Sequence, residues 1–415
     1  MPIRISGSTG ISGLDGSATT PVLQGASANS GIYYSGNTVF VSTSGTNAMT
    51  IGPTGNVDFS NTSVTIGGQT ISSATGMRNR IINGDMKIDQ RYAGSAVTVS
   101  SSAAEWYVVD RTLIEIGGIS GTFGVVQRVT DAPTGFSNSL KYTANSSITY
   151  NGSIGWMGLN QRIEGQNLQD LAWGTASATK VTLSFWVKAS ITGTYTACLM
   201  TYNGSQSRMS NIKYTVNASN TWEYKSITFD GDTNAIGGIA NDNGATGWIR
   251  VYWVLGGQSG SFTATSFNTW FNADGTKRAG SDQVNMLGTN GSTFQITGVQ
   301  LEKGSVATPF EFRQYGTELT LCMRYYVDLS YATQGSTIGM TCNVTNGLNY
   351  HFSFQFPTLM RATPSLTWTE WTSSNFPGTS AIFQSTGKGG TNVYKNANGT
   401  GMGYILGGYT ASAEL

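Results

Sequence analysis

The chain has 415 residues, which is enough for two or three domains of about 150 residues each. Charged residues make up only 11% of it, against about 25% in an average globular protein. Aromatic residues make up another 11%, which supplies enough buriable surface to exclude a disordered chain. The formal net charge of +1 provides no field that would gather phosphates, so we expect no nucleic-acid partner.

Residues 1–7 lack the apolar stretch of a signal peptide, and no uncharged apolar run reaches the roughly 18 residues of a membrane span. We therefore expect a protein that is made without a signal peptide and has no membrane contact. The three cysteines, Cys198, Cys322 and Cys342, are odd in number and form no Cys-x-x-Cys pair. They predict neither a disulfide framework nor a thiolate metal site.

The N-terminal region, residues 1–77, carries only three charged side chains. Short β-prone runs between Gly-containing turns predict strands at residues 38–42, 48–51, 56–59 and 63–66. So few apolar positions cannot form a core in one chain, but identical copies packed about an axis can bury them together. We predict a trimeric, β-rich shaft over residues 1–77.

Charge returns at Arg78, and the predicted strands become longer from there on. Eight runs of antiparallel-strand length predict a β-sandwich over residues 78–313. A short helical turn is predicted at residues 166–171. The eight predicted strands are residues 106–116, 123–129, 154–163, 181–187, 195–202, 222–229, 248–255 and 294–301.

Two of these strands place aromatic residues on a face that points away from the predicted core. In residues 181–188 the odd positions are apolar, so Trp186 shares the other face with polar residues. In residues 248–254 one face carries Trp248, Arg250 and Tyr252.

These four residues are our candidate glycan-binding residues, because pyranose rings stack on aromatic rings while polar groups bind their hydroxyls. In the alternative interpretation the same aromatics pack in the core or in a trimer interface. Trp156, Tyr202 and Trp222 have the same two interpretations.

The C-terminal region, residues 314–415, begins with the best helix pattern of the chain. Tyr315, Leu319, Cys322 and Tyr326 are spaced by four, three and four residues. Strict alternation then predicts strands at residues 350–356 and 366–371. We predict a small β-domain preceded by a short helix, in a chain that is all-β overall.

Catalytic chemistry is poorly represented in the sequence. His351 is the only histidine and stands among alternating aromatics, which excludes paired-histidine zinc motifs and leaves one candidate base without a nucleophile motif. Glycoside hydrolysis needs two carboxylates, but acids scattered along strands and turns are typically solvated. We expect no enzyme and no cofactor; the candidate acids are Glu105, Asp110, Glu115, Glu164 and Glu223.

Several segments resemble a known family. Residues 5–16 and 49–57 resemble the N-terminal shafts of tailed-bacteriophage fibre proteins. The module that begins with RNRIINGDM, residues 78–86, and ends with VQLEKGSVATPF, residues 299–310, is similar to a jelly-roll module of phage fibres that is like carbohydrate-binding modules. Residues 318–326 and 356–365 resemble the end domain of such fibres.

This resemblance implies a homotrimeric tail fibre of a phage virion, made in the host cytoplasm. Met1 to about Gly16 would attach it to tail, baseplate or neck proteins, and the β-domains would contact host cell-surface polysaccharide. The alternative is a purely structural neck, collar, baseplate or head-decoration fibre that binds no receptor. A depolymerase is a third interpretation, which we do not expect.

Related sugar-binding jelly rolls often hold a calcium ion between acids near the first strand and in the last one. Here the part of the last predicted strand at residues 294–299 contains no acid, so Asp85 has no second acid with which to hold a calcium ion. We therefore predict no metal site.

Overall fold

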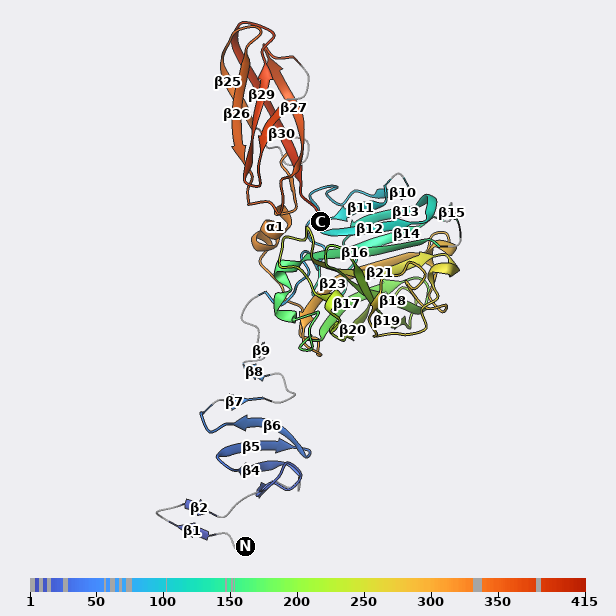
Figure 1. The fold of residues 1–415 in the computed structure, drawn as a ribbon, viewed down its shortest axis with the longest axis vertical. Coiled ribbons are helices and arrows are strands. Elements are labelled where there is room, and N and C mark those ends of the chain that lie inside the picture. The colour runs from blue at the N-terminus through green and yellow to red at the C-terminus, as the bar shows by residue number, and fades with distance from the viewer. Residues whose placement is uncertain are drawn as a thin grey trace. The chain divides into compact units, whose positions relative to one another are not determined.

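The computed structural model describes most of the chain, which divides into two compact units, Met1–Gly76 and Met77–Leu415 (Figure 1). The predicted boundary at residue 77 falls next to this division, and the predicted boundary at residue 313 lies inside the second unit. Residues 1–3, 7–9 and 13–15 of the predicted attachment segment, and residues 56 and 63 at the starts of two predicted strands, lie outside the described residues. The described residues are 4–6, 10–12, 16–24, 29–55, 57–59, 64–66, 69–71, 77–101, 103–145, 148–150, 152, 154–330, 338–377 and 382–415.

The first unit is built on a five-stranded antiparallel sheet with the order β3-β4-β5-β6-β7. Strands β5 (Thr38–Thr43) and β6 (Thr46–Ile51) are joined by Ser44 and Gly45, both at positive φ, as two-residue hairpin turns require. Two further hairpins pair β1 with β2 and β8 with β9. The remaining strands are β1 (Arg4–Ser6), β2 (Gly10–Ser12), β3 (Leu23–Gln24), β4 (Gly31–Ser35), β7 (Val57–Asp58), β8 (Val64–Ile66) and β9 (Gln69–Ile71).

This unit buries little apolar surface within one chain. Among residues 16–24, 29–55 and 57–59, whose burial the structure describes, Pro21 and Tyr33 are the only buried apolar ones, and the Tyr33 ring stacks on Phe40 with 4.7 Å between centroids. Val57 and Phe59 are exposed. A small sheet with so little core gains stability when other surfaces cover it. The trimer stays a prediction.

The second unit begins with a β-sandwich of two seven-stranded antiparallel sheets, which confirms the predicted fold class (Figure 1). Sheet I has the order β10-β13-β14-β23-β17-β20, with β15 paired to β13, and sheet II has the order β11-β12-β16-β21-β18-β19-β22. The strands are β10 (Val97–Ser100), β11 (Glu105–Val109), β12 (Thr112–Gly117), β13 (Ile119–Val129), β14 (Ser139–Ala144), β15 (Ile148–Tyr150), β16 (Trp156–Glu164), β17 (Val181–Ala189), β18 (Gly193–Tyr202), β19 (Ser207–Val216), β20 (Glu223–Phe229), β21 (Trp248–Gly257), β22 (Phe271–Asn272) and β23 (Thr293–Lys303).

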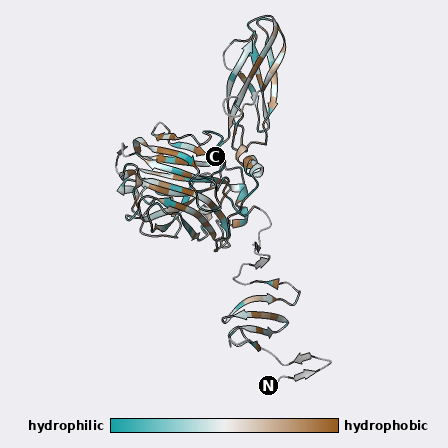
Figure 2. Cartoon of the chain, turned by 180° about the vertical axis from the view of Figure 1, so that it is seen from behind, coloured by the Kyte–Doolittle hydropathy of each residue, from teal (hydrophilic) through white to brown (hydrophobic). Residues whose placement is uncertain are grey.

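Alternation along the strands places the main core between the two sheets, and hydrophobic and hydrophilic residues alternate visibly in Figure 2. On β17 the predicted period of two is confirmed, because Leu183 and Phe185 are fully buried in this core. The predicted helical turn at residues 166–171 is present as two short 3-10 helices, η1 (Gly165–Asn167) and η2 (Gln169–Leu171).

The single strand predicted at residues 106–116 is wrong, because the chain reverses at Asp110 and Arg111 to form two strands, β11 and β12. Arg111 takes a φ of 69°. The Asp110 carboxylate accepts hydrogen bonds from Gln90 N and Gln90 Nε2, both at 2.7 Å, and these contacts hold the turn. Apolar residues continue on both sides of the turn, so periodicity alone does not reveal it.

The C-terminal part starts with the predicted helix, α1 (Tyr315–Met323), and continues into a small β-domain with its own core around Trp368 and Tyr409. The helix buries Glu318 and Cys322, whereas Tyr315 is 61% exposed and Tyr326 already belongs to the next strand. No helix in the described part of the chain could span a membrane. The strands are β24 (Tyr326–Asp328), β25 (Ile338–Val344), β26 (Asn349–Gln355), β27 (Ser365–Ser374), β28 (Ile382–Thr386), β29 (Gly390–Asn396) and β30 (Gly401–Ser412).

Buried polar contacts join this β-domain to the sandwich. The Glu164 carboxylate, which is fully buried, accepts hydrogen bonds from Arg324 at 2.8 and 3.1 Å and from the Tyr325 hydroxyl. Gln90 Nε2 donates to the Tyr326 carbonyl at 2.8 Å. Removing one member of such a buried ionic contact is strongly destabilising. These contacts help to hold the sandwich and the β-domain together as one compact unit, Met77–Leu415.

Candidate functional site

Trp186 lies on the outer face of sheet I. Its strand neighbours Phe185 and Val187 point into the main core, so its own side chain points away from it. The cross-strand partner on β20 is Tyr224, and the two ring centroids are 5.5 Å apart. Trp186 is half-buried and Tyr224 is 46% exposed. Two aromatic side chains are therefore presented together on this face.

These two rings form one wall of an open hollow of about 470 Å³, which we call the aromatic hollow. A second wall is a group of three phenylalanines with ring centroids 4.8 to 5.3 Å apart, Phe136, Phe310 and Phe312. Phe312 is 54% exposed. Polar and small residues complete the lining, namely Thr134, Gly135, Ser184, Gly298, Ala307, Thr308 and Pro309.

Gly298 keeps the floor of the aromatic hollow open. It has a φ of +61°, which L side chains rarely adopt. A Cβ atom at this position would lie 2.7 Å from Phe136 Cζ and 3.0 Å from Trp186 Cδ1. A side chain here would displace both aromatic walls.

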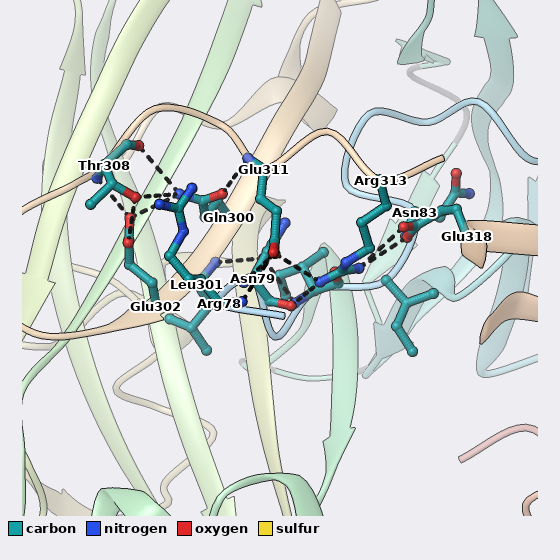
Figure 3. Close-up of polar contacts among 12 residues, drawn as sticks. Arg78, Asn79, Asn83, Gln300, Leu301, Glu302, Thr308, Glu311, Arg313 and Glu318 are labelled. Atoms are coloured by element: carbon teal, nitrogen blue, oxygen red, sulfur yellow. Dashed lines mark hydrogen bonds and ion pairs between the residues drawn. The ribbon is translucent and has the colours of Figure 1, made fainter. Parts of the chain in front are cut away.

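The segment that carries Phe310 and Phe312 is held in place by a network of polar contacts that we call the clasp (Figure 3). Asn79 Nδ2 donates to the Val299 carbonyl at 3.0 Å, and Asn79 Oδ1 accepts from Leu301 N at 3.1 Å. The Glu311 carboxylate accepts from Asn79 N at 2.8 Å. The clasp fastens the first segment of the sandwich to its last strand; it consists of Arg78, Asn79, Asn83, Gln300, Leu301, Glu302, Thr308, Glu311, Arg313 and Glu318.

After β23, residues that belong to the clasp alternate along the chain with residues that line the aromatic hollow. The Glu302 carboxylate accepts from Thr308 N at 2.8 Å and from Thr308 Oγ1 at 2.7 Å, and Gln300 Oε1 accepts from Glu311 N at 2.9 Å. Phe310 stands between Thr308 and Glu311, Phe312 stands between Glu311 and the likewise anchored Arg313, and both rings line the hollow. The first residues of the sandwich, 78–83, and the residues that follow its last strand therefore hold Phe310 and Phe312 in place.

The other three predicted residues lie on the outer face of sheet II, so the structure does not bring them together with Trp186. Arg250 is buried and pairs with Glu115. Trp248 is half-buried, and its ring contacts Tyr202 at 5.1 Å between centroids and the Arg250 guanidinium at 5.1 Å. Tyr252 is only 1% exposed.

The cover over this part of sheet II is the long connection of residues 258–284. Phe262 and Ala279 from this connection pack with Tyr252 and Val254 in a second hydrophobic cluster. Asn211 Nδ2 donates to the Lys277 carbonyl at 2.6 Å and so ties the connection to β19. Tyr252 is consequently a packing residue in this structure, whereas Trp186 borders an open hollow.

Each carboxylate considered for glycoside hydrolysis has a structural partner. Glu105 and Glu115 are cross-strand neighbours on sheet II, Glu164 lies at the junction with the β-domain, and Glu223 lies on β20. The partners, in chain order of the acids, are Arg162 for Glu105, Gln90 for Asp110, Arg250 for Glu115, Arg324 for Glu164 and Lys225 for Glu223.

The remaining reactive residue types also have ordinary surroundings. His351 is exposed and lies beside Asn392, with 3.2 Å between Nδ1 and Oδ1. Burial raises the pKa of the Cys198 thiol to about 12, which keeps it protonated. Asp85 pairs with Lys87 at 2.8 Å. Over the residues that the structure describes, no group of three or more His, Cys, Asp or Glu side chains could hold a metal ion.

The sequence singled out only Trp186 of the five aromatic residues around the hollow. Phe310 and Phe312 had a readable signal, since they alternate with the charged residues Glu311 and Arg313. Tyr224 stands opposite Trp186 through strand pairing, and Phe136 arrives from the connection between β13 and β14. Neither position follows from local sequence.

No protein-family model matches this sequence, and no curated protein matches it either. Solved structures that are similar to it include carbohydrate-binding modules. The CBM22-1 xylan-binding domain from Paenibacillus barcinonensis Xyn10C has 9% identity and a TM-score of 0.25, covering 52% of this chain and 99% of that one. TmCBM61 in complex with β-1,4-galactotriose has 10% identity and a TM-score of 0.24, covering 55% and 99%.

A third similar structure is the C-terminal family 22 carbohydrate-binding module of Clostridium thermocellum Xyn10B, with 14% identity and a TM-score of 0.26. It covers 50% of this chain and 99% of that chain.

Proposed function

We propose that this chain is a glycan-binding fibre protein of a bacteriophage virion, with the aromatic hollow as its glycan site and without enzymatic activity. The observation that carries the glycan part is the hollow itself, where five aromatic rings surround an open space of about 470 Å³. The apolar faces of pyranose rings stack on such rings, and the polar lining can bind hydroxyl groups.

The virion part of the proposal rests on the resemblance of the N-terminal, central and C-terminal segments to phage fibres. The thin core of the first unit supports a homotrimer, because three copies can bury apolar side chains that one copy leaves exposed. Three identical weak sites raise apparent affinity about a hundredfold or more through effective concentration. Sedimentation of the full chain as a monomer would contradict this part.

The glycan site is tested by binding of the full chain to an array of bacterial surface polysaccharides and to whole cells. We expect saturable binding, and we expect Trp186→Ala to weaken it at least tenfold while the thermal unfolding curve keeps its shape. Trp371→Ala is the matched control, since Trp371 is 51% exposed but lies on β27, outside the sandwich.

Two results would contradict the glycan site. One is a folded chain that retains no polysaccharide, which favours the purely structural appendage. The other is a Trp186→Ala variant that binds as well as the unmodified chain. If Trp186→Ala instead dissociates the assembly, Trp186 is an interface residue.

A further inference from the structure

The outer face of sheet I continues beyond the aromatic hollow into a polar cluster, which we call the shelf and which consists of Asp131, Lys188, Trp222 and Gln295. The Asp131 carboxylate accepts hydrogen bonds from Lys188 Nζ at 2.6 Å, from Gln295 Nε2 at 3.2 Å and from Trp222 Nε1 at 3.2 Å. Lys188 Nζ also lies 5.7 Å from the centroid of the Trp222 ring.

The shelf is fixed from below but open above. Gln295 is 2% exposed, and its Oε1 accepts from Ser139 Oγ at 3.1 Å, which fixes the amide that holds Asp131. The Asp131 side chain is 48% exposed, and Trp222 is half-buried. A carboxylate can accept about four hydrogen bonds, so Asp131 retains capacity toward solvent.

Strand geometry places the shelf next to the hollow. Trp186 and Lys188 stand two residues apart on β17, on the same face, which corresponds to about 6.6 Å. Tyr224 on β20 faces Trp186. Trp222 lies two residues before Tyr224, immediately ahead of the first residue of β20. One connection, residues 130–138, supplies Phe136 to the hollow and Asp131 to the shelf.

We propose that the shelf is a second sugar subsite, so that the ligand is an uncharged oligosaccharide of at least two residues laid along β17 and β20. This inference rests on the proposed glycan function. One sugar stacks in the aromatic hollow, and the next places hydroxyls against Asp131 and Lys188 beside the Trp222 ring. The paired charges of Asp131 and Lys188 cancel, and the Asp131 carboxylate repels a ligand carboxylate, so a neutral sugar fits best.

The test measures affinity of the full chain for ladders of one to six residues of glucose, galactose, mannose and rhamnose, with a glucuronate ladder as the charged counterpart. We expect affinity to rise at least tenfold from one residue to three on a neutral ladder. Lys188→Met and Trp222→Ala should remove this gain and leave monosaccharide binding unchanged, whereas Trp186→Ala should weaken every length.

Lys213→Met is the matched control. Lys213 on sheet II also pairs with an aspartate, Asp282 at 2.8 Å, and lies 4.2 Å from the centroid of an aromatic ring, Phe267. This variant should keep the full length dependence.

The outcomes separate the two proposals. Binding that depends on Trp186 but not on ladder length, Lys188 or Trp222 overturns the shelf and leaves the glycan function in place. Tighter binding of the glucuronate ladder overturns the uncharged ligand. Absence of binding to every ladder and to every arrayed polysaccharide overturns both proposals.

Discussion

The two outer faces of the sandwich carry similar residue types but present them differently. On sheet I, Trp186 and Tyr224 border an open hollow of about 470 Å³. On sheet II, Tyr252 is buried under the connection of residues 258–284, and Arg250 is buried beside Glu115. Period-two alternation shows only that a side chain points away from the main core. Whether that side chain reaches solvent depends on connections that come from elsewhere in the chain.

The largest expected difference between the two faces is in stability. Tyr252→Ala should lower the free energy of unfolding by about 3–5 kcal/mol, because it empties a fully packed position in the second hydrophobic cluster. Trp186→Ala should cost clearly less, because the side chain is only half-buried. Urea unfolding of both variants measures the difference. Equal losses would show that both aromatics are packing residues.

A second prediction concerns the floor of the aromatic hollow. Gly298→Ala should destabilise the chain by about 2–4 kcal/mol, through its positive φ and through crowding of Phe136 and Trp186. It should also weaken glycan binding. Gly291→Ala is the control, since Gly291 has a φ of +75° but a Cβ added there would meet nothing within 4 Å. If both variants lose the same stability, the floor is not crowded.

A smaller effect distinguishes two aspartates, Asp110 beside sheet II and Asp131 beside sheet I. Burial raises the pKa of Asp110, at the turn between β11 and β12, to about 6, although hydrogen bonds from Gln90 oppose the shift. On sheet I, the hydrogen bond from Lys188 lowers the pKa of Asp131. Asp110 therefore takes up a proton between pH 7 and pH 5 more readily in the folded state, whereas Asp131 stays ionised.

The sign of the pH effect follows from linkage. A carboxyl group whose folded pKa is raised favours folding at low pH, and its contribution is lost as the pH rises through the folded value. Stability should increase by about 1 kcal/mol from pH 7 to pH 5. Urea unfolding at both pH values measures this, and Asp110→Asn should remove the slope. If Asp110→Asn keeps the same change of unfolding free energy with pH, that change arises from other titrating groups.

Much of the fold could be predicted because the strands that line the main core are strongly patterned. The odd positions of β17 and the apolar positions of β21 and β23 identify strands with one face in the core. Strand β19 was missed because its sequence, SRMSNIKYTV, mixes polar and apolar residues. Its outer face is covered by the connection of residues 258–284, so it needs no solvated polar face in strict alternation.

The candidate site was predictable only in part. Trp186 stood out because it is a large aromatic among polar neighbours on one strand face. Phe310 and Phe312 depend on the clasp, in which residues 78–83 bond to residues more than two hundred positions later. Contacts at such separation leave no trace in local periodicity. The cover over Tyr252 comes from nearer in the chain, the connection that follows β21, but period-two alternation does not reveal it either.

The most direct test of the difference between the two faces is hydroxyl-radical footprinting of the full chain with and without bound polysaccharide. We predict protection of Trp186, Tyr224 and Phe312 on ligand binding, with unchanged reactivity of Tyr202 and Trp248. Protection of Tyr202 and Trp248, with unchanged reactivity of Trp186, would place the ligand on sheet II and contradict the assignment of the aromatic hollow.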